Sequence, residues 1–425
     1  MAVSSTNYTG TSNTFITPDV VAREALMILE KSLIAPSVMN SSAASEWSGS
    51  KVGDTVRVRR PAFFGVDEFN SDTPGTVVKI QDAVETSVDL KIEKNYDVSF
   101  EVSSKELTLS VDDFNERLLT PAMSALAQRI DTYAMSKIAG LGGLGANTNY
   151  TAPSSVEDLA AIVQKLNEQK VPQSNRKMVV SPAMQSAIYS IDNFVQAQMS
   201  GAATSPLQEA QLGRFMGMDM LMALDLPQHT VGSLLQAGSG DVSFAINASG
   251  GLTEGTDTID LDSGPGSGVQ DAVPGDTIRI TYVDGVERDH VIVGTSASLN
   301  TGTLNVQVAP ALYGVDPGTG SSAVSGGQPV VVAHQAPVAL TGGSSSITGY
   351  TMGAAFVPEA FQLIFVPQPA PMGPGTSSAT VSYKGMSLRV LQSFDHEKKR
   401  DLISVDCMLG CAALDPRLGL RIPAV

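Results

Sequence analysis

The apolar positions change their period several times along the chain, and each change predicts a different element. Residues 1–16 are polar and predict an arm that needs a partner to become ordered. Thr17 and Pro18 then suit the cap and first position of a helix, because proline lacks only an N–H that the first turn leaves unpaired. Pro36 predicts that this helix ends near Ala35. Its apolar face would consist of Val21, Ala25, Ile28 and Leu29.

Between residues 51 and 105 the apolar positions alternate with polar ones, which is the period of a half-buried strand. Two alternating stretches, 52–58 and 84–102, flank a stretch rich in Gly, Pro and Asp at 65–76, and together they predict an extended β-hairpin. Charges of both signs line one face, so the hairpin should project into solvent or lie on another subunit. These charges are Asp89, Lys91, Glu93, Lys94, Asp97 and Glu101.

A long helical stripe follows, with an apolar residue at every fourth position. Ser110 would begin the helix, with Asp113 as a weaker form of the capping box. Pro121 predicts a kink or break near Arg117, because proline clashes with the carbonyl four residues before it. The glycine-rich run 140–145 would end the helix. The stripe consists of Phe114, Leu118, Ala122, Leu126, Ile130 and Ala134.

The next stretch alternates helix, strand and helix, which indicates α/β or α+β packing. Ser154, with Glu157 completing a capping box, would begin a helix that closes before Pro172. A short buried strand is expected at Met178–Val180, and Ser181-Pro182 would start the next helix. A further strand is expected at 217–224.

The composition changes at about Gly232. Through Gly349 the chain has no Lys, Cys, Met or Trp, and its eleven acidic residues and two arginines give a charge of −9. Short β-branched runs separated by Gly, Asp and Ser turns predict an all-β domain, either a small barrel or a sandwich. The runs are 242–246, 277–283, 290–293, 304–308 and 330–333.

The earlier composition returns after residue 350. Residues 357–361 suggest a helix start, and 380–394 predicts one long strand. A polar turn at 395–401 and a returning strand at 402–412 would follow. Asp415-Pro416-Arg417 is expected to end the fold.

The net charge of the 425 residues is −16, and no concentrated basic face is visible, so sequence-specific DNA binding is not expected. The polar residues 1–14 lack the basic and apolar regions of a secretory signal. No stretch reaches the ~20 apolar residues of a membrane span. We therefore expect a protein that has no membrane partner and stays in the cytoplasm of its host until assembly.

The sequence contains no recognisable catalytic motif. The run 140–145 has glycines but no lysine and follows a helix, so it does not suit a phosphate. Asp257, Asp260 and Asp262 lack the glycine that a calcium loop requires. Cys407 and Cys411 are expected to be free buried thiols, and the four histidines, His229, His290, His334 and His396, are scattered singly. No catalytic, cofactor-binding or metal-binding residue is predicted, and the chain is not expected to be an enzyme.

Four local motifs stand in a definite order. Lys51-Val-Gly-Asp-Thr-Val-Arg-Val-Arg-Arg-Pro61 opens the predicted hairpin, and Gly213-Arg-Phe-Met-Gly-Met-Asp219 precedes Leu226-Pro227. Tyr383-Lys-Gly-Met-Ser-Leu-Arg-Val390 and Leu414-Asp-Pro-Arg-Leu418 lie near the end. Over nearly the whole chain they resemble the extended loop, axial domain and C-terminal hairpin of tailed-phage major capsid (coat) proteins. The resemblance is to those of the Hong Kong 97-type fold, in the branch similar to the phage P-twenty-two coat protein.

The resemblance implies an α+β capsid fold with an inserted all-β domain. Its parts would be an N-terminal arm and helix (1–50), an extended β-hairpin (51–105), a peripheral domain with the spine helix (106–153), an axial domain in two parts (154–231 and 350–379), an inserted barrel-like domain (232–349) and a C-terminal β-hairpin that completes the peripheral domain (380–425).

The resemblance also implies partners. The chain would bind itself in the hexamers and pentamers of an icosahedral virion capsid that encloses double-stranded DNA without sequence-specific contact. A portal protein at one vertex and, optionally, a decoration protein would join it. Only about 50 residues precede the hairpin, too few for a fused scaffolding domain, so a separate scaffolding protein and an uncleaved N-terminus are expected.

Two alternatives stay open. A β-rich phage tail or cell-surface binding protein would need secretion or tail attachment, and the helical content of residues 17–140 argues against it. An enzyme without a recognisable motif is the other. Electron microscopy of the purified protein would separate shells or capsomers from small discrete particles.

Overall fold

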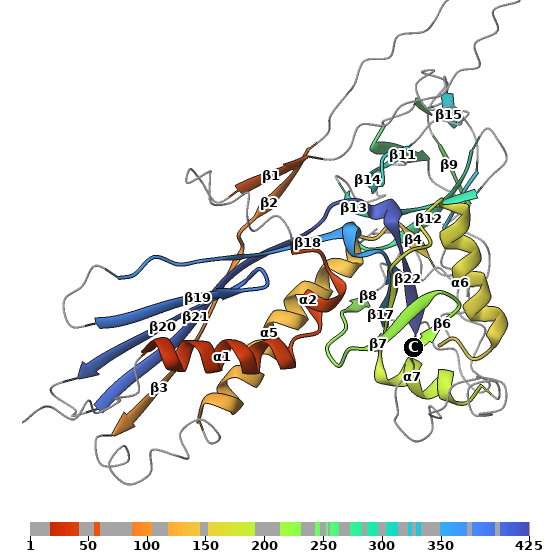
Figure 1. Cartoon of the computed structure of the whole chain (residues 1–425). Helices are drawn as coiled ribbons and strands as arrows, with labels where there is room; N and C mark the ends of the chain where they lie inside the picture. The colour runs from red at the N-terminus through yellow and green to blue at the C-terminus, as the bar shows by residue number, and fades with distance from the viewer. Residues whose placement is uncertain are drawn as a thin grey trace, which may run out of the picture. The chain divides into compact units, whose positions relative to one another are not determined.

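The computed structural model is an α+β protein, and strands outnumber helices among the residues that it describes (Figure 1). These residues are 18–41, 55–59, 87–103, 118–144, 152–191, 213–230, 243–246, 252–253, 256–262, 273–282, 287–295, 303–312, 322–324, 329–332, 349–371, 376–395 and 400–424. The chain forms two compact units, each assembled from three segments. Unit 1 comprises Met1–Leu33, Ile92–Arg129 and Ile364–Gly410, and unit 2 comprises Ile34–Lys91, Ile130–Leu363 and Cys411–Val425.

A five-stranded sheet lies largely in unit 1. Four strands follow the order β18-β21-β20-β19, and β3 pairs with β21 as well. The β19–β20, β20–β21 and β21–β3 pairs are antiparallel. The strands are β3 (Lys94–Ser103), β18 (Phe361–Val366), β19 (Thr376–Tyr383), β20 (Met386–Asp395) and β21 (Arg400–Ala413).

Helix α1 (Pro18–Ser32) packs against β19 and β20. Its predicted apolar face is confirmed for Val21, Ala25 and Leu29, which are buried, whereas Ile28 is half-buried. The predicted end near Ala35 is wrong. The helix ends at Ser32, and Pro36 lies in the first turn of the short helix α2 (Ala35–Val38). A proline in a first turn loses no hydrogen bond, so here it starts a helix instead of stopping one.

The predicted hairpin is half right. Strands β1 (Thr55–Arg59) and β2 (Ser87–Lys91) do pair antiparallel, but the second stretch breaks at residues 92–93. Beyond the break, β3 pairs with β21 and not with β1. The alternation runs through the break unchanged, so the hydrophobic pattern did not reveal that one stretch serves two sheets. The polar stretch 65–76 lies outside the described residues.

Helix α5 (Thr120–Ser136) is the predicted long helix, and a 3₁₀ turn at Lys137–Gly140 ends it at the glycine-rich run. Pro121 is the second residue of α5, and the described residues 118–119 directly before the helix are π-helical. The predicted start at Ser110 and the kink near Arg117 lie outside the described residues.

The predicted apolar stripe of α5 is only partly correct. Leu126, Ile130 and Ala134 are buried, but Leu118, just before the helix, is 38% exposed. Leu119 and Met123 are buried at that end. An α-helix has 3.6 residues per turn, so a strict repeat of four drifts around the helix and leaves the buried face.

Unit 2 contains a mixed seven-stranded sheet. Six strands follow the order β4-β22-β17-β5-β7-β6, and β8 pairs with β17. The β5–β7 and β4–β22 pairs are parallel. The strands are β4 (Gly143–Leu144), β5 (Arg176–Val180), β6 (Arg214–Phe215), β7 (Met218–Met222), β8 (Gln228–Thr230), β17 (Gly349–Phe356) and β22 (Gly419–Ala424). The predicted strands at 178–180 and 217–224 are thus confirmed as β5 and β7.

Helices α6 (Val156–Glu168) and α7 (Pro182–Tyr189) pack on this sheet through one apolar core. Ser181 caps α7 as predicted, because its hydroxyl accepts from the Met184 N–H. The start of α6 was predicted one residue early. Ser155 is the cap, and the carboxylate of Asp158 completes the capping box by accepting from the Ser155 N–H. The core includes Leu159, Ile162, Leu166, Met178, Val180, Met184, Ile188, Met218, Leu420 and Ile422.

Three predictions near the C-terminus are wrong. Pro358–Ala360 form one 3₁₀ turn that leads into β18, and no longer helix follows. The single strand predicted at 380–394 is two strands, joined by a turn at Lys384-Gly385, where both residues have positive φ. The chain does not finish at residues 415–417, because β22 follows and enters the unit 2 sheet.

Six strands of unit 2 close into a barrel in the order β11-β14-β13-β12-β16-β9. They are β9 (Ser243–Ile246), β11 (Thr258–Asp262), β12 (Thr277–Thr281), β13 (Glu287–Thr295), β14 (Thr303–Ala309) and β16 (Pro329–Val332). Five coincide with predicted runs. The sequence missed β11, because its acidic residues suggested a solvated turn. A separate pair joins β10 (Leu252–Thr253) to β15 (Ser322–Val324).

Replacing Gly353 with Ala is expected to destabilise unit 2 by about 1–3 kcal/mol, because a core that gains atoms must strain. A Cβ there would lie 2.8 Å from the Val179 carbonyl oxygen and 2.9 Å from Met184 Sδ. Gly140→Ala is the matched control, since its Cβ would meet its nearest neighbour at 3.5 Å. Urea unfolding of both variants measures the difference, and equal midpoints would contradict the prediction.

Candidate functional site

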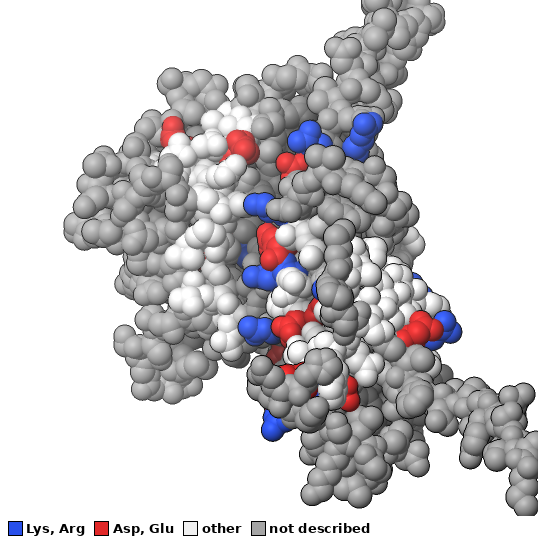
Figure 2. Space-filling view, turned by 90° about the vertical axis from the view of Figure 1, so that its left-hand side faces the viewer, with Lys and Arg blue, Asp and Glu red and all other residues white. Residues whose placement is uncertain are grey.

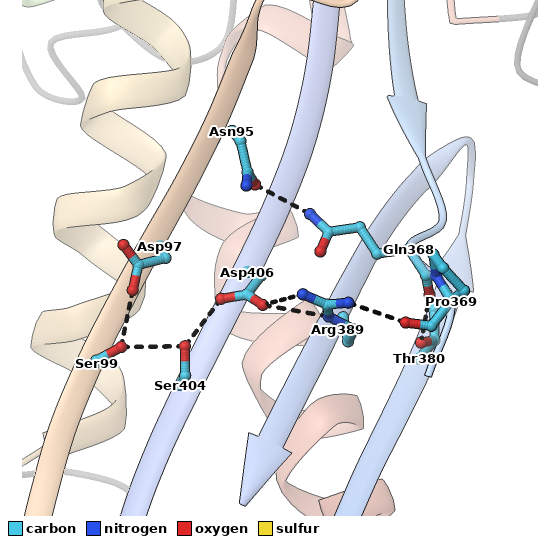
Figure 3. A network of polar contacts seen from close by, with 9 residues as sticks. All are labelled: Asn95, Asp97, Ser99, Gln368, Pro369, Thr380, Arg389, Ser404 and Asp406. Carbon is cyan, nitrogen blue, oxygen red and sulfur yellow. Dashed lines mark hydrogen bonds and ion pairs between the residues drawn. The ribbon is translucent and has the colours of Figure 1, made fainter. Parts of the chain in front are cut away.

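One face of the sheet in unit 1 carries a row of polar side chains (Figure 3). The opposite face includes Val390 and Val405, which face one another across β20 and β21 and are buried. The strand register alone builds the row, because side chains that face one another across strands project to the same side. Four adjacent strands align Thr380, Arg389, Asp406 and Asp97.

An ion pair lies at the centre of this row. Arg389 donates to Asp406 Oδ2 from Nη2 at 2.6 Å and from Nε at 3.2 Å. Its Nη1 donates to the Pro369 carbonyl at 2.9 Å. The side chains are only 18% and 9% exposed, so this pair is much less screened by solvent than a surface pair.

Hydroxyl and amide groups extend the row in both directions. The Ser404 hydroxyl donates to Asp406 Oδ1 at 2.8 Å, and Ser99 Oγ lies 3.0 Å from Ser404 Oγ and 2.8 Å from Asp97 Oδ2. On the other side, the Gln368 amide donates to Asn95 Oδ1 at 3.0 Å. These groups therefore hydrogen-bond one another on one face of the sheet.

The β1–β2 hairpin offers a second polar surface. Arg57 Nε lies 3.0 Å from Asp89 Oδ1 across the two strands, and the side chains are 73% and 56% exposed. Such an exposed pair contributes about 0–1 kcal/mol to stability. Its charges therefore remain accessible to a partner, as the sequence predicted for this segment.

A buried polar cluster, here called the barrel joint, lies within unit 2. Arg421 Nη1 donates to the Gly275 carbonyl at 2.5 Å, and its Nη2 donates to the Thr277 hydroxyl. Nearby, His229 Nε2 lies 2.8 Å from Asp276 Oδ1. Arg421 and Asp276 are fully buried and His229 is nearly so.

A third polar contact joins the barrel to α6. Asp289 on β13 lies 2.7 Å from Arg279 Nε and 3.2 Å from Lys165 Nζ. Although burial opposes its ionisation, Arg279 and Lys165 hold the pKa of this carboxyl below its usual range. The sequence did not predict that these residues form polar clusters. The sequence did contain a signal for buried polar contacts, because Arg389, Asp406 and Arg421 each interrupt an apolar strand.

The structure does not bring the acidic residues considered as metal ligands together into one site. Within the described ranges, no group of three His, Cys, Asp or Glu side chains could hold a metal ion. Asp257 accepts from the Gln307 amide at 3.1 Å and Asp260 from the Asn305 amide at 2.6 Å, while the side chain of Asp262 is not described. None of the helices that the structure describes has the length and apolar character needed to cross a membrane.

Cys407 and Cys411 are free and buried, as predicted. Burial, and then the neighbouring Asp406 carboxylate, raise the pKa of Cys407 to about 12, so its thiol stays protonated at neutral pH. His229 belongs to the barrel joint and His290 to the barrel interior, and His334 and His396 lie outside the described residues.

Basic and acidic side chains are interspersed on the face shown in Figure 2. Blue and red atoms alternate there, and the described residues of this face form no broad basic patch. Lys398 and Lys399 lie outside the described residues, while Arg400 pairs with Glu101.

Comparisons with known proteins gave structural matches only. No protein-family model and no curated protein matches the chain. A chain of Mycobacterium phage Che8 shares 13% identity and a TM-score of 0.47, over 92% of this chain and 90% of that chain. The capsid of Cyanophage P-SCSP1u shares 10% identity and a TM-score of 0.42, over 88% of this chain and 84% of that chain. The capsid of the native GTA particle shares 10% identity and a TM-score of 0.42, over 91% of this chain and 92% of that chain. At these identities and TM-scores, the likeness does not assign a function to this chain.

Replacing Arg389 with Met is expected to destabilise unit 1 by about 2 kcal/mol, because it leaves the Asp406 carboxylate buried without its cation. Arg57→Met is the matched control, since it breaks an exposed pair and should change stability by less than about 1 kcal/mol. Guanidinium unfolding of the monomeric chain measures both. Equal effects of the two substitutions would contradict the buried pair's importance.

His290 predicts a pH dependence of the barrel. Burial lowers its pKa from 6.5 to about 4, although its Nδ1 lies 2.8 Å from the Pro310 carbonyl. The unfolded chain therefore binds a proton first as the pH falls, and stability present above pH 6.5 is lost between pH 6.5 and 4. The loss is about 3 kcal/mol. Thermal unfolding of wild type and His290→Gln across this range measures it, and parallel curves would refute the assignment.

Proposed function

We propose that this chain is a major capsid protein that assembles into the icosahedral shell of a tailed DNA phage. The observation that carries the proposal is the order of elements along the chain. Helix α1, a β-hairpin with exposed charges, helix α5, a mixed sheet and a returning antiparallel pair follow one another. The sequence resemblance implies the same order for the Hong Kong 97-type fold.

The β1–β2 hairpin supports assembly. The described strands form a sheet of two strands only, and isolated two-stranded hairpins are marginally stable in water. Its charged residues include Arg57, Asp89 and Lys91, which are exposed. A neighbouring copy would supply the missing surface, and contacts repeated by symmetry would add up over a closed shell.

The polar face of the sheet in unit 1 supports the same role. Its side chains are already positioned by Arg389 and Asp406, so little conformational entropy is lost when another surface binds it. Charged and hydroxyl-bearing faces are typical of contacts that must form and be corrected during assembly. We assign this face and the hairpin to contacts between copies.

The domain partition follows from the proposal. The barrel strands lie between β8 and β17 in the chain, within the acidic stretch 232–349. We assign this stretch to an inserted domain, between axial segments 154–231 and 350–379. Its charge of −9 favours the outer surface, because like charges would repel packaged DNA across the inner wall.

The proposed partners are those of a shell protein. They are further copies in hexamers and pentamers, a separate scaffolding protein, a portal protein at one vertex, an optional decoration protein and enclosed double-stranded DNA without sequence-specific contact. Assembly would take place in the cytoplasm of the bacterial host. The chain has no enzymatic role in this proposal.

Electron microscopy of the purified chain, expressed with and without its scaffolding partner, tests the proposal. Closed shells or capsomers are expected, and discrete small particles would overturn it in favour of a tail or cell-surface binding protein. We also expect a single band near 44.3 kDa on reducing denaturing gels. Lys79, Lys91 and Lys94 are available for a covalent link, but the sequence shows no matching acidic residue in a recognisable context. A ladder of higher bands would show covalent linkage instead.

A further inference from the structure

The C-terminal strand β22 has the core with α6 and α7 on one face and the start of the barrel on the other. It pairs with β17 on one edge and with β4 on the other, so it is an inner strand although it is made last. Leu420 and Ile422 point into the apolar core shared with α6 and α7. Arg421, between them, points to the other face, because successive side chains of a strand alternate.

Arg421 is the one charged residue of this strand, and its environment is unusual. It is fully buried, and it donates through Nη1 to the Gly275 carbonyl and through Nη2 to the Thr277 hydroxyl. Burial lowers its pKa, while Tyr350 and Asp276 act in the opposite direction. A buried guanidinium is costly unless it is paired and hydrogen-bonded, so these contacts are needed where they are.

The acceptors of Arg421 belong to the start of the barrel. Residues 275–277 lead into β12, and Asp276 fixes this turn by accepting from the Val273 N–H at 2.9 Å. Gly275 has φ +105 and lies against the ring of His229, which would collide with a Cβ at 2.7 Å. The turn is therefore held rigidly, and its carbonyl is presented to Arg421.

The register of β22 depends on the same contact. A shift by one residue would turn Arg421 into the apolar core and Leu420 and Ile422 onto the barrel, because a one-residue slip exchanges the two faces of a strand. A slip would also bring a side chain to the position of Gly419, where a Cβ would lie 2.7 Å from Phe356 Cβ. Arg421 and Gly419 therefore both oppose the slipped register.

We propose that Arg421 is a positioning residue that couples docking of the barrel to closure of the C-terminal strand. Its two hydrogen bonds form only when the 275–277 turn is docked and β22 is in its native register. The barrel and the sheet then open together and not separately. This inference concerns the single folded chain and does not rest on the proposed capsid function.

Hydrogen exchange of the full-length chain, read by peptide mass spectrometry, tests the coupling. Arg421→Met keeps the volume of the side chain but removes both donors. We expect amide exchange in β22, β12 and β13 to rise about tenfold or more, since a hydrogen bond from a charged group contributes about 1.5–3 kcal/mol. Exchange in β20 and β21 should not change. Arg421→Lys should restore part of the protection.

Thr277→Val is the milder test, because it removes one acceptor of Arg421 and nearly keeps the shape of the side chain. It should raise amide exchange in β22 in the wild-type background. In the Arg421→Met background it should raise this exchange by less than about twofold further, because the two groups act as a pair. Thr277→Ser, which keeps the hydroxyl, is the matched control and should behave as wild type.

Three outcomes would overturn the proposal. Arg421→Met could leave β12 and β13 at wild-type exchange while β22 alone changes, which would make Arg421 a local packing residue. Arg421→Met could raise amide exchange equally in every element, including β20 and β21, which would show a general loss of stability. The effects of Thr277→Val and Arg421→Met could also be additive, which would show that the two residues act independently.

Discussion

The sheet of unit 2 depends on the pairing of its last-made strand. Until β22 lies between β4 and β17, these two strands have unsatisfied backbone groups, and buried backbone groups must be paired. The same strand closes the apolar core with Leu420 and Ile422. Its opposite face has to accept a buried cation. The sheet, its core and the barrel joint therefore depend on the correct placement of six residues, Gly419–Ala424.

Unit 1 uses a different arrangement. Its sheet has one apolar face that α1 covers and one polar face on which the side chains bond each other. A polar face of this kind stays compatible with water when exposed and with another polar surface when covered. The buried Arg389–Asp406 pair fixes the geometry of the face in the free chain.

The buried carboxylates of both units have polar partners, whereas the net charge of the chain is strongly negative. The net charge of the chain is −16, yet Asp406 pairs with Arg389, and Asp289 pairs with Arg279 and Lys165. The buried Asp276 carboxylate is hydrogen-bonded to the His229 ring. The excess acid lies elsewhere, with much of it in 232–349. The net negative charge therefore affects solubility more than it affects the packing of either unit.

The sequence by itself determined the local elements whose signals are local. Ser181-Pro182 predicted α7 because a cap and an N1 proline act within one turn, and the β-branched runs predicted five barrel strands. It did not determine where strands pair. The alternation at 84–102 is the same whether it serves one sheet or two, and Gly419–Ala424 contains too few residues for a periodic signal. Only the tertiary structure decided that β3 joins β21, that β22 becomes an inner strand, and that Arg421 meets Thr277. Those contacts join residues distant in the chain, and their free energy comes from burial and pairing that no short window of sequence contains.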